Sequence, residues 1–230
     1  MRDFFLAYSG IVITVVTILN LVICGLLIYS SVKNKKIMPL CMGLIAFGLF
    51  YDGLIISLGN KLSGNPGLLT GLSQVRYLCH GLFVPLIFPI CAFALFKTKK
   101  LISIGWIIGV VLIALGIASG IATELELSTI AGVTRYTFAE STPAWANGIT
   151  YLLSFGCVIP LIITGVIVWK KQKTPFLFLS GFLMFLFSAL PPATGNTDLI
   201  FSISMLGEVS MVFFMLLYQR VWLKNADTNT

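Results

Sequence analysis

Charge is scarce in this sequence, and histidine is nearly absent. Of the 230 residues only 10% are charged, His80 is the single histidine, and 58% are hydrophobic, with a mean hydropathy of +1.01. A water-soluble domain carries about 25% charged residues, so this composition excludes an ordinary soluble fold. A single histidine also excludes zinc sites that need two or three histidine ligands.

Long polar stretches are missing as well. Seven apolar runs are each about 20 residues long or longer, which is enough to cross about 30 Å of hydrocarbon. The runs are residues 8–32, 37–59, 74–96, 101–123, 145–169, 175–193 and 199–222. Residues 124–144 form the longest connection, and we expect them to be a loop. The sequence therefore predicts an all-α polytopic membrane protein, with residues 1–230 as a single domain of seven transmembrane helices.

Basic residues gather on one side of this seven-span arrangement. The side holds eleven of the fifteen lysines and arginines: Lys33, Lys35, Lys36, Lys97, Lys99, Lys100, Lys170, Lys171, Lys173, Arg220 and Lys224. Cytoplasmic loops are enriched in Lys and Arg, so the pattern predicts an N-terminus outside and a C-terminus inside. The formal charge of +7 then belongs to solvated loops near anionic lipid, and we expect no nucleic-acid partner.

Four ionisable side chains fall inside the predicted spans. Asp52, His80 and Glu208 lie about 9 to 13 Å from the outer ends of their spans, and Arg76 lies nearer that end. Ionisable groups are costly in a bilayer unless they are paired, and they commonly mark functional sites. We expect Arg76 to pair with Asp52 or Glu208, and His80 to donate to the other carboxylate. The alternative is a polar clasp that only fixes helix packing.

Neighbouring polar residues extend this candidate site. Tyr51 and Tyr77, each next to one of the four, are further ligand-binding candidates. Other intramembrane polar residues are weaker candidates for lining a cavity, because most such groups only bond neighbouring helices. They are Asn20, Asn147, Tyr151, Ser154 and Ser188.

Residues 76–86 resemble the third helix of microbial (type 1) rhodopsins. Arg76-Tyr77 and, further on, Pro85-Leu86 occur here at the family's spacing, in a third span that runs inward. The resemblance implies a rhodopsin-like bundle. It also implies that covalent retinal is excluded, because the family needs a lysine in its last helix, and Glu208 stands at or near that place.

The same helix departs from that family in its chemistry. Cys79 and His80 stand where the family has its aspartate and tryptophan. The chain also looks like a group of prokaryotic seven-span proteins with Asp-Gly, Arg-x-x-x-His and Gly-Glu segments, matched here by residues 52–53, 76–80 and 207–208. This second likeness favours a prokaryotic plasma membrane and implies no particular function.

Three functions fit the sequence. The leading one is binding or sensing of a small or lipid-like ligand in a polar pocket in the outer half of the membrane, with His80 as a pH switch and no metal or other cofactor. A proton-coupled transporter of small solutes is the alternative, with Asp52 and Glu208 exchanging protons with His80. An intramembrane enzyme acting on lipid is less favoured, because no catalytic spacing is present. The expected partners are the lipid bilayer and the ligand, and the sequence leaves a homo-oligomer open.

Overall fold

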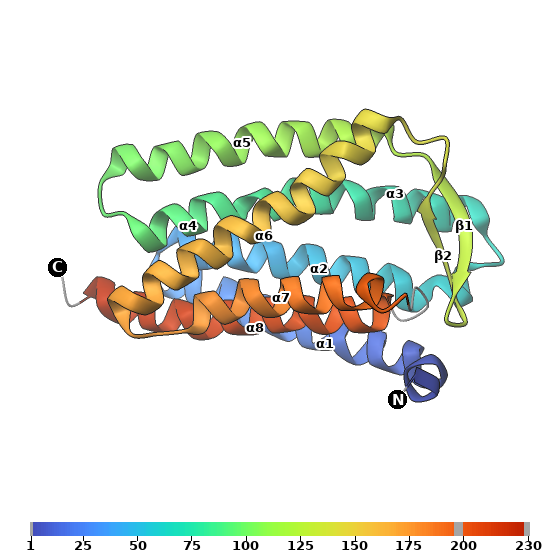
Figure 1. The fold of residues 1–230 in the computed structure, drawn as a ribbon, viewed down its shortest axis with the longest axis horizontal. Coiled ribbons are helices and arrows are strands. Elements are labelled where there is room, and N and C mark those ends of the chain that lie inside the picture. The colour runs from blue at the N-terminus through green and yellow to red at the C-terminus, as the bar shows by residue number, and fades with distance from the viewer. Residues whose placement is uncertain (1, 196–199, 228–230) are drawn as a thin grey trace.

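The structure is a computed structural model that describes residues 2–195 and 200–227. It is a bundle of long helices with one β-hairpin at one end (Figure 1). The elements are α1 (Arg2–Asn34), α2 (Ile37–Leu62), α3 (Pro66–Phe83), the 3₁₀ turn η1 (Val84–Leu86), α4 (Ile87–Leu95), α5 (Lys99–Ala122), β1 (Leu125–Ile130), β2 (Val133–Phe138), α6 (Ala144–Gln172), α7 (Phe176–Ala193) and α8 (Ile200–Asp227). The predicted helical class is confirmed, whereas Leu199, the predicted start of the last span, lies outside the described residues.

Helices of membrane-crossing length make up most of the described chain. Six segments are long and apolar enough to span a bilayer, in α1, α2, the α3–η1–α4 rod, α5, α6 and α8. A further apolar helix in α7, Phe176–Pro191, is shorter. The chain is therefore an integral membrane protein with several transmembrane helices, as its composition predicts.

The two ends of the bundle differ in chemistry. Figure 1 shows the start of α1 and the β-hairpin at one end, which we call the hairpin end. The opposite end carries the connections α1–α2, α4–α5 and α6–α7 and the C-terminus, and we call it the lysine end because residues 33–36, 97–100 and 170–173 lie there. The lysine clusters that the sequence shows in three connections therefore all lie at the same end of the molecule.

The third span starts at Pro66, earlier than the sequence predicts, and a short 3₁₀ turn interrupts its α-helix between α3 and α4. Pro66 takes the first turn of α3, where its missing N–H costs nothing, and Asn65 caps the helix by accepting from Leu68 N at 3.3 Å. Pro85 lies in the 3₁₀ turn η1, because a proline inside a helix removes one α-helical hydrogen bond. Arg76 is therefore ten residues inside α3 rather than near the start of the span, where the sequence places it.

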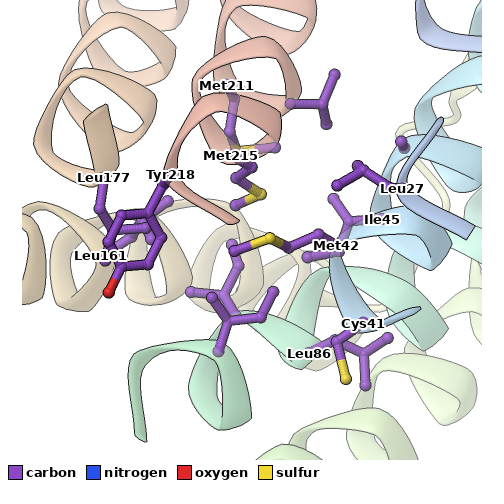
Figure 2. Close-up of a cluster of buried hydrophobic side chains, with 14 of the residues drawn as sticks. Leu27, Cys41, Met42, Ile45, Leu86, Leu161, Leu177, Met211, Met215 and Tyr218 are labelled. Carbon is purple, nitrogen blue, oxygen red and sulfur yellow. The ribbon is translucent and has the colours of Figure 1, made fainter. Parts of the chain in front are cut away.

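An apolar core fills the half of the bundle nearer the lysine end. Figure 2 shows Met42 of α2 and Met215 of α8 extending into the space between these helices. Leu27, Ile45 and Leu161, from three helices, are each at most 1% exposed. Such close packing leaves little room for water between the helices.

Residues 124–144 are not the irregular loop that the hydropathy predicts. β1 and β2 pair antiparallel from Leu125 with Phe138 to Ile130 with Val133. Ala131 and Gly132 connect them, both with positive φ (51° and 75°), as a two-residue type I′ turn requires. The alternating Leu, Thr, Val, Tyr and Phe side chains of this segment favour strands, and hydropathy averaged over a span length does not detect that pattern.

Candidate functional site

Arg76 is a junction between α2, α3 and the hairpin. Its Nε lies 3.2 Å from Oδ1 of Asp52. Its Nη2 donates to the Tyr77 hydroxyl at 2.8 Å and to the Tyr136 carbonyl in β2 at 3.0 Å. The Arg76 side chain is only 5% exposed, whereas Asp52 is 27% exposed. Of the two pairings expected for Arg76, the structure shows the one with Asp52.

The hairpin is fastened to the helices by further contacts. The side chain of Asn60 at the end of α2 donates to Gly132 O at 2.9 Å and accepts from Thr134 N at 2.7 Å. The ring of Tyr77 packs on Phe138, with centroids 4.7 Å apart. The hairpin is thus held by α2 and α3 above the ion pair.

Arg135 adds a second guanidinium beneath the hairpin. It is 2% exposed. Burial and the nearby charge of Arg76 lower the pKa of Arg135 to about 9, while the Asp52 carboxylate acts in the opposite direction. Arg135 therefore stays protonated at neutral pH, and the hairpin carries a buried positive charge close to Asp52.

A cavity of about 280 Å³ lies directly beneath the hairpin. It brings together the ion pair, three more of the predicted site residues and two residues of β2. Its lining is Leu49, Asp52, Ile56, Arg76, Tyr77, His80, Thr137, Phe138, Thr150, Ser154, Ser204, Met205 and Glu208. Five of the six predicted ligand-binding residues therefore line one cavity, drawn from α2, α3 and α8.

Three buried side-chain atoms of the residues that line this cavity have no hydrogen-bond partner among the described residues. They are Oε2 of Glu208 and Nε and Nη1 of Arg76, and Nε forms the ion pair with Asp52. A buried polar atom without a partner costs about 1 to 3 kcal/mol. Glu208 and Arg76 both line this cavity, so these two side chains form its polar end. The hydrogen bond expected from His80 to a carboxylate is not among those the described residues make.

A second, larger cavity of about 460 Å³ continues from the first. The two share lining residues, including His80, Phe138 and Glu208. The rest of its wall is mainly apolar and comes from α4, α6, α7 and α8: Ile87, Tyr151, Phe155, Val158, Met184, Phe185 and Met211. The combined space has a polar end beneath the hairpin and an apolar arm between α6 and α7.

The lysine-end side of this space is closed by the apolar core. Met211 lines the large cavity, and Met215, one turn further along α8, is fully buried. Ile45 lies one turn before the lining residue Leu49 on α2, and Ile90 lies almost one turn beyond Ile87. Each helix thus passes from cavity wall to packed core within about one turn.

Tyr51 is the predicted site residue that does not line the cavity. Its hydroxyl donates to Leu72 O at 3.3 Å, so it joins α2 to α3. Successive residues of a helix point about 100° apart, so a side chain next to Asp52 does not share its direction. Asn20 also lines neither cavity and is fully buried in α1. The weaker candidates Asn147, Tyr151, Ser154 and Ser188 all line the larger cavity.

Several lining residues were not identified from the sequence. Thr137 and Phe138 come from the hairpin, whose alternating pattern could have indicated a strand. Thr150 lies one turn before Ser154, and Ser204 one turn before Glu208, so helical spacing could have found both. Met184 and Phe185 carry no sequence signal, since apolar residues fill most of α7.

Within the part of the chain that the structure describes, no three His, Cys, Asp or Glu side chains lie close enough to hold a metal ion. A comparison with models of protein families found no match, and a comparison with curated proteins also found none. The site must therefore be interpreted from its own geometry.

Proposed function

We propose that this protein binds or senses a small or lipid-like ligand in the pocket formed by the two joined cavities. The observation that supports the proposal is the pair of unpartnered buried atoms, Glu208 Oε2 and Arg76 Nη1, at the polar end of a mainly apolar space. Ligand sites are typically apolar cavities of about 300 to 1,000 Å³ with a few convergent polar groups. The two joined cavities, of about 460 and 280 Å³, are of this size, and their polar side chains gather at one end.

The proposal includes an orientation in the membrane. With α7 as a seventh span, 18 residues give about 27 Å, close to the hydrocarbon thickness. The lysine end then faces the cytoplasm by the positive-inside rule, and the hairpin and pocket lie in the outer half of a prokaryotic plasma membrane. The likeness to microbial rhodopsins, without covalent retinal, belongs to this proposal as well.

Roles within the pocket follow from the contacts. Asp52 and Arg76 hold α2, α3 and the hairpin together, so we assign Asp52 to positioning the site, and Arg76 both to positioning it and to contact with the head of the ligand. Glu208 and His80 line both cavities, so we assign them to contact with the ligand. These roles leave fewer ligand-contacting residues than the six predicted from the sequence.

A proton-coupled transporter is the rival function. Asp52, His80 and Glu208 line one cavity, which a proton relay would also need. The packed core on the lysine-end side supports binding over transport, because a transported solute would have to pass the buried Met42, Ile45 and Met215. Solute flux into liposomes under a pH gradient separates the two functions: transport predicts uptake that depends on Glu208, and binding alone predicts none.

A pair of substitutions on one helix tests the binding proposal. Ser154→Trp places an indole in the space where both cavities meet, whereas Ile163→Trp adds the same group on the outer face of α6, where Ile163 is 56% exposed and lines neither cavity. We expect saturable binding of a twelve-carbon amphiphile to wild type and Ile163→Trp in nanodiscs. Affinity should fall by at least about tenfold in Ser154→Trp, as expected for lost access to a buried pocket. Equal binding by all three proteins contradicts the proposal.

A further inference from the structure

The helices α6 and α7 separate toward the hairpin end. Near the lysine end they are in close contact, since a methyl group added at Gly165 would meet the backbone of Phe178, and one at Gly181 would meet Ile162. Near the hairpin end α6 contacts α5 instead, where Ser119 Oγ donates to Ala146 O at 2.8 Å. Figure 1 shows α6 crossing the bundle obliquely between these two contacts. The larger cavity lies in the resulting wedge.

The mouth of this wedge lies on the lateral surface of the bundle. Three residues that line the cavity are also exposed on that surface: Tyr151 (66%) and Phe155 (45%) of α6 and Phe185 (39%) of α7. In a membrane protein this surface faces lipid chains. The route from the hairpin end is covered instead, because Phe138 of β2 lines both cavities and packs on Tyr77.

The polar end limits the chemistry of the head group. Glu208 Oε2 and Arg76 Nη1 have no hydrogen-bond partner among the described residues. The Arg76 guanidinium only donates, whereas the Glu208 carboxyl group accepts when it is ionised and both donates and accepts when it is protonated. An alkylammonium head only donates, and a carboxylate only accepts. A hydroxyl or an amide does both in either state of Glu208, and it adds no charge to a region that already holds the charges of Asp52, Arg76 and Arg135.

We propose that the ligand is a single-chain amphiphile with an uncharged hydroxyl or amide head, and that it enters from the bilayer between α6 and α7. The head lies between Glu208 and Arg76, and the chain extends along Phe155, Met184 and Phe185 toward the lipid. This inference rests on the proposed function, and it adds a ligand class and a route to it.

The head group is tested with ligands that share one chain length. Binding of dodecanamide, dodecylammonium and dodecanoate is measured in nanodiscs, with Ser154→Trp as the blank for partition into lipid. We expect dodecanamide to bind at least about tenfold tighter than either charged ligand, because the amide can both donate to Glu208 and accept from Arg76 and brings no charge into the pocket. Butanamide, which carries the head without the long chain, should bind far more weakly.

Two variants of Glu208 distinguish hydrogen bonding from charge. Glu208→Gln keeps an acceptor oxygen, so dodecanamide affinity should stay within about threefold of wild type, whereas Glu208→Leu should lose about tenfold. Thermal unfolding of both variants identifies any loss due to misfolding. If dodecylammonium binds best and Glu208→Gln abolishes its binding, the pocket selects a cation and the assigned head group is wrong.

The route is tested with two phenylalanines of α7 that are both 39% exposed. Phe185 lines the cavity and Phe182 does not. Stopped-flow measurements with an amide that carries a fluorophore at the end of its chain should show at least about threefold faster association in Phe185→Ala than in wild type, and no such change in Phe182→Ala. Acceleration only in the hairpin variant Phe138→Ala overturns the lateral route. That result would leave the binding proposal intact, which fails only if Ser154→Trp has no effect on any ligand.

Discussion

The ion pair between Asp52 and Arg76 should be energetically coupled to the docking of the hairpin. Arg76 is 5% exposed and makes three polar contacts: with Asp52 at 3.2 Å, with the Tyr77 hydroxyl at 2.8 Å and with Tyr136 O at 3.0 Å. Removing one partner of a buried pair costs about 3 to 5 kcal/mol, whereas exposed pairs contribute about 0 to 1 kcal/mol. Asp52 is 27% exposed, so we expect Asp52→Asn to cost about 2 kcal/mol, between these limits.

A double-mutant cycle measures this coupling. Arg76→Met should cost about 3 to 4 kcal/mol, because it also removes the bond to the hairpin carbonyl. The double variant should be less destabilised than the sum of the single variants by about 1 to 2 kcal/mol. Equilibrium unfolding of the purified protein in mixed micelles gives these values, and Lys61→Met, which removes an exposed cation from the same end of the bundle, is the matched control.

Hydrogen exchange at the amides of residues 125–138 provides the second readout. Arg76→Met should accelerate exchange along β2, because the hairpin loses a contact with α3, whereas Lys61→Met should not. Additive single variants, with a coupling below about 0.5 kcal/mol and unchanged hairpin exchange, would refute the role assigned to Arg76.

Three further predictions concern the supports of the pocket. Asn60→Ala removes two hydrogen bonds to the hairpin, so it should lower stability by about 1 to 2 kcal/mol and accelerate exchange at Thr134, measured by the same two methods; unchanged exchange would contradict the docking. Gly165→Leu should force α6 from α7 at the close contact with Phe178 and lower the unfolding temperature, while Gly148→Leu, at a position with no neighbour near its Cβ, should not. Ala131→Asn should stabilise the hairpin by about 0.5 to 1 kcal/mol, because asparagine tolerates the positive φ of 51° better than alanine; faster exchange in the variant would show that the turn is not limiting.

The sequence predicts the helices well, and it identifies most of the side chains that share the polar cavity. Apolar runs reveal spans because backbone groups in lipid must bond within their own helix. Asp52, His80 and Glu208 are costly in a bilayer when isolated, and their similar predicted depth on different helices was the reason to expect them together. The shared cavity of Asp52, Arg76, His80 and Glu208 agrees with that reasoning.

Other features depend on tertiary geometry that a linear pattern does not record. Tyr51 is adjacent to Asp52 in sequence but contacts Leu72 O, because rotation around the helix separates neighbours. The hairpin carries a short alternating pattern that long hydropathy windows average away. The apolar arm of the pocket depends on the tilt of α6, which is set by Ser119 at one end and Gly165 at the other. Neither residue stands out in the sequence.

Photolabelling shows directly whether a ligand occupies the pocket beneath the hairpin. Dodecanamide with a diazirine at the end of its chain is irradiated with the protein in nanodiscs, and the labelled peptides are identified by mass spectrometry. We expect labels on residues 151–158 of α6 and 184–188 of α7, which excess dodecanamide suppresses and which are absent in Ser154→Trp. Labels that are spread over the lipid-facing surfaces of α1 and α5 and resist competition would contradict the proposed pocket.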